Sequence, residues 1–233
     1  GSSLRELLRS LWLEKSDRDK QRLVGASNLS NECTRCLAEQ MAVMLPGVIF
    51  GEASVSKYIM GAKIGTAIHL YLEEQAKEKE WAQPETRVIL GAIKGYGTIK
   101  STSDLYIKAL KAIVDHKTST KAKVEVYRTL VDLDMMHEIP EIEPDTWRAG
   151  RKTVKRYLVQ GNLYGLGCEN RGDEVTTVAL NFIPRDSKTL DDMWVHEVDY
   201  DREVALRALD RGQRIWDALV EGKSMHTIRS DVD

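Results

Sequence analysis

The chain has 233 residues, of which 42% are hydrophobic and 30% charged, and its formal net charge is −2. This length can bury one proper core, and the charge argues against a protein coated all over with positive residues, although local basic patches stay compatible with it. Because the sequence contains neither a run of roughly 18 apolar residues nor the apolar core of a signal peptide, we expect an intracellular, cytoplasmic protein without a membrane partner.

Helical spacing of apolar residues dominates the first third of the chain. It predicts an amphipathic helix over 4–15, a second helix over 33–45 and a longest helix over 54–80. The pattern then changes to three short, β-branched segments that are typical of a meander: 87–93, 95–109 and 111–119.

The remaining elements are a helix over 120–136, a helix over 147–167, strands over 174–183 and 193–199, and a final helix over 201–222. This order predicts an α/β fold in which a central mixed β-sheet is flanked by helices. We divide the chain into an N-terminal helical cover, which carries a C-x-x-C motif, and a core: 1–53 and 54–233.

Three cysteines are present, Cys33, Cys36 and Cys168, and this odd number without a secretory signal argues against a disulfide framework. Cys33 and Cys36 form the lone C-x-x-C. A structural zinc needs four ligands, and an iron–sulfur cluster normally needs four cysteines. The motif therefore predicts either two accessible thiols at a helix start or half of a metal site that residues beyond Asp233 complete.

Opposite charges follow an apolar triplet in the third predicted strand, in the stretch KAIVDHKTST. Alternate strand residues face the same way, so Asp115 and Lys117 leave the sheet together while His116 points to the other face. Asp104 lies in the preceding strand, and a hairpin between the two strands would bring both carboxylates to one end of the sheet. Such carboxylates repel each other unless a cation lies between them, and Mg²⁺ or Mn²⁺ suits hard oxygen ligands. The alternative is a surface ion pair worth less than about 1 kcal/mol.

Predicted helices carry three further candidates. His69 lies mid-helix, where a histidine is either a packed core residue or a ligand. Gln160 and Tyr164 are four residues apart, so an amide and a phenol share one helical face. This pair serves either a site or ordinary helix–helix hydrogen bonding.

Five cations before Gln160 fall on one helical stripe: Arg148, Arg151, Lys152, Lys155 and Arg156. Such a stripe can follow the phosphates of a nucleic acid, whose contacts dominate affinity, or can be a solvated face. Lys121, just after the third predicted strand, can add to the same DNA-binding surface.

The segments GTAIH, STSDLYI, IVDHKTS and QGNLY follow one another over roughly residues 60–170. In this order they resemble the motif series of the PD-(D/E)XK nuclease superfamily, and most closely its RecB-like branch with phage and mitochondrial exonucleases and CRISPR-associated adaptation nucleases. The resemblance implies a restriction-endonuclease-like core, so that 54–233 would be the nuclease core.

The resemblance also implies roles for single residues. His69, Asp104, Asp115 and the main-chain carbonyl of His116 would bind Mg²⁺ or Mn²⁺, and Lys117 would be the catalytic lysine. His116 stands where family members usually have a glutamate, which this branch tolerates by using the carbonyl.

Two further motifs carry family roles. Gln160 and Tyr164 match the Q-x-x-x-Y motif, which in the family supports the active site and the DNA strand. Members of this branch often join N-terminal and C-terminal cysteines around zinc or an iron–sulfur cluster. The resemblance therefore implies that Cys33 and Cys36 form part of a second metal site with cysteines beyond Asp233.

The sequence thus predicts a metal-dependent DNA nuclease, specifically an exonuclease acting on ends or single strands in phage or recombination and repair processing. A recombination or replication protein is a candidate partner. The alternatives are a non-catalytic DNA-binding accessory module and a structure-selective or nicking endonuclease. Retention of both acids and the lysine favours an enzyme, because a module that only binds DNA has no chemical need for them.

Overall fold

The computed structural model describes the following residues of the chain: 23–46, 59–135, 144–224 and 227–228. The helix predicted over 4–15 lies outside them. None of the helices in these stretches is long and apolar enough to cross a membrane.

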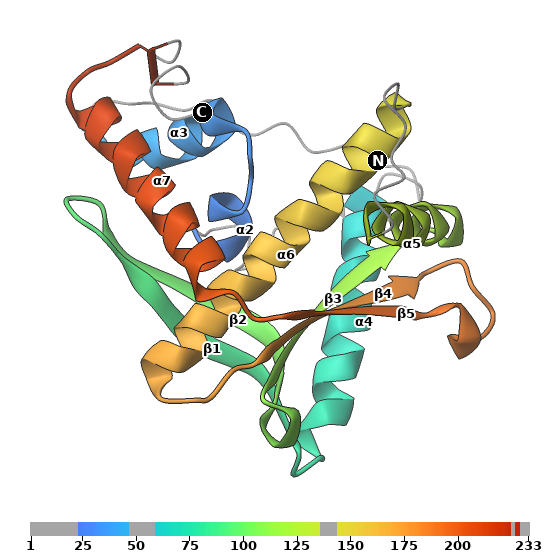
Figure 1. Ribbon diagram of the computed structural model, residues 1–233. Coiled ribbons are helices and arrows are strands. Elements are labelled where there is room, and N and C mark those ends of the chain that lie inside the picture. Colours follow the sequence, from blue (N-terminus) through green and yellow to red (C-terminus); the bar gives the residue numbers. More distant parts are fainter. Residues whose placement is uncertain (1–22, 47–58, 136–143, 225–226, 229–233) are drawn as a thin grey trace, which may run out of the picture.

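Five strands form one sheet in the order β1-β2-β3-β4-β5 (Figure 1). Their bounds are β1 Ala82–Ile93, β2 Gly97–Ile107, β3 Ala112–Ser119, β4 Thr177–Pro184 and β5 Trp194–Asp199. Only β3 and β4 pair in parallel, while the other neighbours are antiparallel. The presence of both kinds of pair confirms the mixed sheet. The parallel pair β3–β4 is joined by a helical crossover, as parallel strands require.

The described helices flank this sheet. They are α2 Ala26–Leu29, α3 Thr34–Ala42, α4 Ile59–Lys77, α5 Lys121–Met135, α6 Asp145–Arg171 and α7 Arg202–Val220, with short 3₁₀ turns η2 Lys108–Leu110 and η3 Leu190–Asp192. The helix predicted to end at Gly167 continues to Arg171, and Gly172 closes it in the left-handed region at φ 98°.

The two faces of the sheet are covered by different helices. Ile113 of β3 packs with Leu163 of α6, whereas its neighbour Val114 packs towards Ala76 of α4. Alternation along β3 thus separates a large core under α6 and α7 from a smaller one under α4 (Figure 1).

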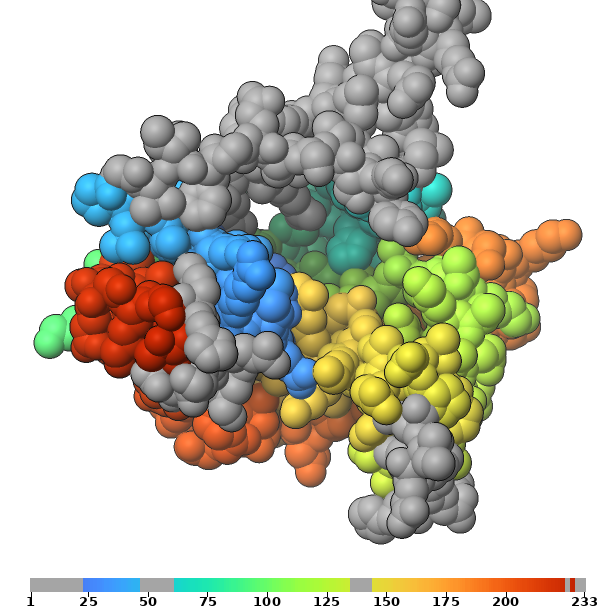
Figure 2. Space-filling view, turned by 90° about the horizontal axis from the view of Figure 1, so that it is seen from above, coloured from blue at the N-terminus to red at the C-terminus, as the bar shows by residue number. Residues whose placement is uncertain are grey.

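The N-terminal helices α2 and α3 belong to the large core. Leu29 and Leu37 are fully buried in the same cluster as Ile215 of α7, and Figure 2 shows these N-terminal helices lying against α7. The described part of the predicted cover, 1–53, therefore shares one hydrophobic core with the rest of the chain.

Glycines let α6 lie unusually close to its neighbours. A Cβ at Gly161 would overlap the side chain of Val178 in β4, and a Cβ at Gly165 would come within 2.6 Å of the Tyr200 ring. Since Gln160 and Tyr164 stand directly before these two glycines, the close approach sets how deeply both side chains reach into the sheet.

We expect Gly161→Ala to lower the free energy of unfolding by about 1–3 kcal/mol, because the added methyl group must push α6 away from Val178. Denaturant unfolding measures this effect. The matched control is Ala149→Ser on the exposed side of the same helix, with an expected change within about 0.5 kcal/mol. Equal stability of the two variants would contradict the close packing.

Candidate active site

The pairing of β2 with β3 is short, and the candidate site lies where it stops. The ladder runs only from Leu105↔Val114 to Ile107↔Ala112. Beyond it the strands separate, and the N–H of His116 donates to the Asp104 carboxylate at 2.8 Å instead of to the β2 backbone. Asp104 thus satisfies a backbone donor that would otherwise lack a strand partner.

Asp115 and Lys117 leave β3 together, as strand alternation predicts. Lys117 Nζ lies 2.6 Å from Asp115 Oδ2, and the Asp115 side chain is only 2% exposed. Burial raises the pKa of Asp115 to about 7; Lys117 opposes this rise, and the charge of Asp104 adds to it. Of the two aspartates, Asp115 is therefore the one that takes up a proton more readily.

Asp104 behaves in the opposite way. Burial alone would raise its pKa, but the hydrogen bond and charge of His69 and the N–H of His116 together lower it to about 2. His69 reaches from α4 to within 3.4 Å of Asp104 Oδ2, and the hydrogen bond with Asp104 raises the pKa of His69. His69 is therefore no ordinary core histidine, since it faces a carboxylate.

His116 points to the opposite face, as strand alternation predicts. Its Nδ1 lies 3.1 Å from the Asn181 amide of the neighbouring strand β4, and burial lowers the pKa of its imidazole. The His116 ring also meets the edge of the His69 ring, with centroids 5.9 Å apart, while its main-chain N–H donates to Asp104.

A chain of polar contacts holds Lys117 from α6. Gln160 Oε1 accepts a hydrogen bond from Lys117 Nζ at 3.1 Å, and Gln160 Nε2 donates to the Tyr164 hydroxyl at 2.6 Å. The ring of Tyr157 lies under the same ammonium group at 4.4 Å. Gln160 and Tyr164 thus meet the lysine as one unit, and Tyr157 is a third contact that the sequence did not single out.

Because a partly desolvated cation–π contact is worth about 0.5–2 kcal/mol, we expect Tyr157→Leu to lower any turnover that depends on Lys117 roughly 2- to 30-fold. Tyr157→Phe keeps the ring and should stay near wild type. A readout independent of turnover is the ¹H NMR shift of the Lys117 Cε protons, which the ring should move upfield in wild type and Phe but not in Leu. Identical shifts in all three proteins would refute the contact.

These residues open into a cleft of about 1000 Å³. Its lining includes His69, Asp104, Asp115, Lys117, Gln160 and Tyr164, together with Arg87 and Lys100 from β1 and β2. Five segments that are distant in the sequence thus contribute to one cavity. Arg87 and Lys100 were missed because an isolated cation on a strand carries no motif, and only their outward alternation could have suggested them.

The predicted basic stripe lies mostly elsewhere. Arg148, Arg151, Lys152 and Lys155 line a second groove of about 580 Å³ between α5, α6 and β5. Lys155 also pairs with Glu32 at 3.3 Å. Arg156 instead donates to the main chain of Ser27, a residue that lines the cleft.

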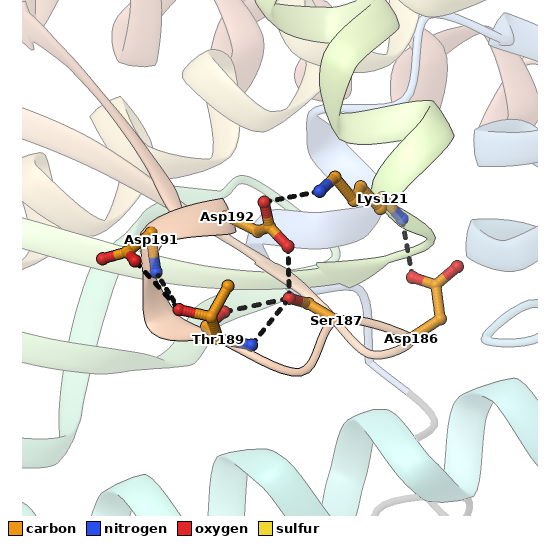
Figure 3. A network of polar contacts seen from close by, with 6 residues as sticks. All are labelled: Lys121, Asp186, Ser187, Thr189, Asp191 and Asp192. Atoms are coloured by element: carbon orange, nitrogen blue, oxygen red, sulfur yellow. Dashed lines mark hydrogen bonds and ion pairs between the residues drawn. The ribbon is translucent and has the colours of Figure 1, made fainter.

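Lys121 starts α5 and is held by the connection between β4 and β5 (Figure 3). Its N–H donates to Asp186 at 2.7 Å, and its Nζ lies 2.6 Å from Asp192, which also accepts from Ser187. A DNA phosphate would have to compete with Asp192 for this ammonium group. Lys121 could therefore bind DNA, as predicted, only if its ion pair with Asp192 breaks.

The C-x-x-C motif does not hold the two free thiols that were one of the expectations. Cys33 and Cys36 are joined as a disulfide at the start of α3, where Cys33 Sγ also accepts from the Cys36 N–H. The predicted second metal site would require reduction of this bond and stays a prediction. Cys168 is a buried free thiol, and burial raises its pKa to about 11.

The strand fork is the place where β2 and β3 separate, next to Asp104 and Asp115. The side chains there fit a hard divalent cation. Within the described stretches, no three His, Cys, Asp or Glu side chains gather into a ready metal cage. Two carboxylates with a neighbouring histidine and a free strand end match the demands of Mg²⁺ or Mn²⁺, which keep several waters and use few protein oxygens. Burial is the main cause of the raised Asp115 pKa, and a cation would relieve the smaller part that comes from repulsion by Asp104.

The α/β fold of this chain is shared with solved exonucleases. The sequence matches no protein-family model and no curated protein. The structure is similar to a phage-related exonuclease from Haemophilus somnus 129PT, with a TM-score of 0.52 and 12% identity over 90% of this chain and 100% of that chain. It is also similar to the alkaline exonuclease LHK-Exo from Laribacter hongkongensis, with a TM-score of 0.50 and 10% identity over 95% and 97% of the two chains. The chain therefore has the fold of these exonucleases, as the sequence resemblance implied.

Proposed function

We propose that this chain is a divalent-metal-dependent deoxyribonuclease that hydrolyses phosphodiester bonds at DNA ends or in single strands. The observation that carries the proposal is the pair of carboxylates and the lysine at the strand fork, opening into a large cleft. The exonuclease fold supports the same reaction class. A role inside the cell in phage, recombination or repair DNA processing would suit this activity.

Asp104 and Asp115 would hold the cation, with His69 and the main-chain carbonyl of His116 as further ligands. When bound, Mg²⁺ or Mn²⁺ supplies Lewis-acid stabilisation of phosphate charge and a water nucleophile at neutral pH. His69 orients the Asp104 carboxylate from the side of α4.

Lys117 would stabilise the negative charge that grows on the phosphate during in-line displacement. Asp115 and Gln160 hold its ammonium group from two sides, and Tyr164 fixes the Gln160 amide. The lysine is thus preorganised before substrate arrives, which is the condition under which an electrostatic contact lowers a barrier most.

The DNA backbone would contact cations in the cleft and on the stripe. Replacing Arg87 and Lys100 with Ala should flatten the plot of log K against log salt by about 1.4 for single-stranded DNA, since each lost phosphate contact removes about 0.7. Lys152→Ala with Lys155→Ala tests the stripe in the same way.

The matched control for both doubles is Lys108→Ala with Lys111→Ala, which removes two cations from the β2–β3 turn at the far end of the strands. Fluorescence anisotropy over a range of NaCl concentrations measures all three variants. An unchanged slope in either test variant would remove that surface from the DNA path.

The proposed activity is tested with linear and circular DNA, single- and double-stranded, incubated with Mg²⁺, Mn²⁺ or EDTA. We expect linear DNA to be degraded with metal and every substrate to survive in EDTA. Nicking of circular DNA would instead indicate an endonuclease. Binding without cleavage under every metal condition would overturn the nuclease proposal in favour of an accessory module.

A further inference from the structure

A small side pocket opens next to the catalytic cleft. It has a volume of about 200 Å³ and lies between α4 and the first residues of β1. His69, Glu85 and Asp104 line both the cleft and this pocket. The three residues therefore form a shared wall, and a molecule in the pocket would lie directly beside the reacting phosphate.

The surface exposed in the pocket is mostly apolar and includes an aromatic ring, although charged and polar side chains also line it, among them Glu73, Lys79 and His116. Leu72 and Ala76 of α4 face Pro84 and Leu105 of the sheet. Trp81 also lines the pocket, and this residue is 52% exposed, so its indole is accessible to a ligand. An apolar slot with one exposed indole is suited to a flat aromatic ligand.

The backbone of β1 is distorted at the shared wall. Glu85 has φ 45°, in the left-handed region that non-glycine residues seldom adopt, and it lacks a paired residue on β2 although Pro84↔Leu105 and Thr86↔Ser103 on either side keep one register. The left-handed backbone takes Glu85 out of the regular strand geometry at the place where this residue lines both cavities. Held strain of this kind is typical of functional sites.

We propose that this pocket receives one unstacked nucleobase of the DNA strand, from the nucleotide next to the phosphate that is cut, with Trp81 as the stacking face. This proposal rests on the proposed nuclease function and extends it. The space is below the roughly 300 Å³ of a typical small-molecule pocket but can admit one planar ring system. Stacking accepts every base because each has a π-face, so the pocket would separate the end nucleotide without reading sequence.

The test uses single-stranded oligonucleotides that carry 2-aminopurine at the end or in the interior, bound in EDTA so that metal-dependent cleavage cannot occur. We expect the end probe to be quenched by wild type and by Trp81→Phe, which keeps a ring. Trp81→Ala should lose the quenching and bind the end roughly 5- to 150-fold more weakly. Trp147→Ala, a half-buried tryptophan on the first turn of α6, is the control and should behave as wild type.

A second variant tests whether Trp81→Ala acts only by destabilising the fold. Ala76→Met keeps Trp81 but fills the slot, so it should also abolish the quenching while its thermal unfolding stays close to wild type. If Trp81→Ala and Ala76→Met both quench and bind as wild type does, the pocket proposal is overturned. Wild type that binds and quenches but never cuts with Mg²⁺ or Mn²⁺ would leave the pocket in place and end the nuclease proposal alone, whereas no binding at all would end both.

Discussion

Asp115→Asn should abolish metal-dependent cleavage, with a loss of roughly 10²- to 10³-fold or more, and leave DNA affinity nearly unchanged. The substitution keeps the shape of the side chain but removes one of the two charges that would hold the cation. In the proposed function, phosphate contacts would come from other cations that line the cleft, such as Arg87 and Lys100. Initial cleavage rates with Mg²⁺ and anisotropy in EDTA measure the two quantities on one preparation.

Retained Mg²⁺-dependent cleavage by this variant would refute the assignment of Asp115. The pH dependence of the free energy of unfolding tests the environment of Asp115. The pKa of Asp115 rises from 3.8 to about 7 in the fold. Between these values the folded state binds more protons than the unfolded state, so Asp115 makes wild-type stability fall as pH rises. In EDTA, Asp115→Asn should therefore gain stability relative to wild type between pH 5 and pH 8. The opposite trend would show that Asp115 is not held in the way described.

Lys117→Ala should lower kcat by roughly 10²- to 10³-fold with little change in DNA affinity, because its ammonium group acts where charge develops. The lysine is only 14% exposed and held by Asp115 and Gln160, so in the proposed mechanism it would contact the reacting phosphate rather than the wider DNA surface. Single-turnover rates at saturating enzyme, together with anisotropy, separate the two effects.

Lys108→Ala is the matched control, because this lysine is exposed on the turn between β2 and β3 and does not line the cleft. It should cut at close to the wild-type rate. An equal loss of rate and affinity in Lys117→Ala would make Lys117 a binding residue instead.

The arrangement of the fork could be predicted from the sequence because it depends on local rules. Strand alternation puts Asp115 and Lys117 on one side and His116 on the other, and the 2.6 Å ion pair confirms this geometry. Helical spacing likewise puts Gln160 and Tyr164 on one face, where they hydrogen-bond.

Features that depend on tertiary packing could not be predicted. Periodicity showed that the stripe cations share a helical face, but it cannot say which cavity that face lines. Tyr157 has the pattern of any core aromatic, and only its 4.4 Å contact with Lys117 distinguishes it. The left-handed backbone of Glu85 and its missing partner on β2 depend on how β1 meets β2, which no local pattern encodes.

The most direct test of the site is Mn²⁺ binding followed by electron paramagnetic resonance, since protein-bound Mn²⁺ loses the sharp signal of the free ion. The two acids at the fork predict saturable binding by wild type that is lost in Asp104→Asn/Asp115→Asn. Cys33→Ser/Cys36→Ser, which alters the other candidate metal site, should bind as wild type. Unchanged Mn²⁺ binding in the double aspartate variant would contradict a metal site at the strand fork.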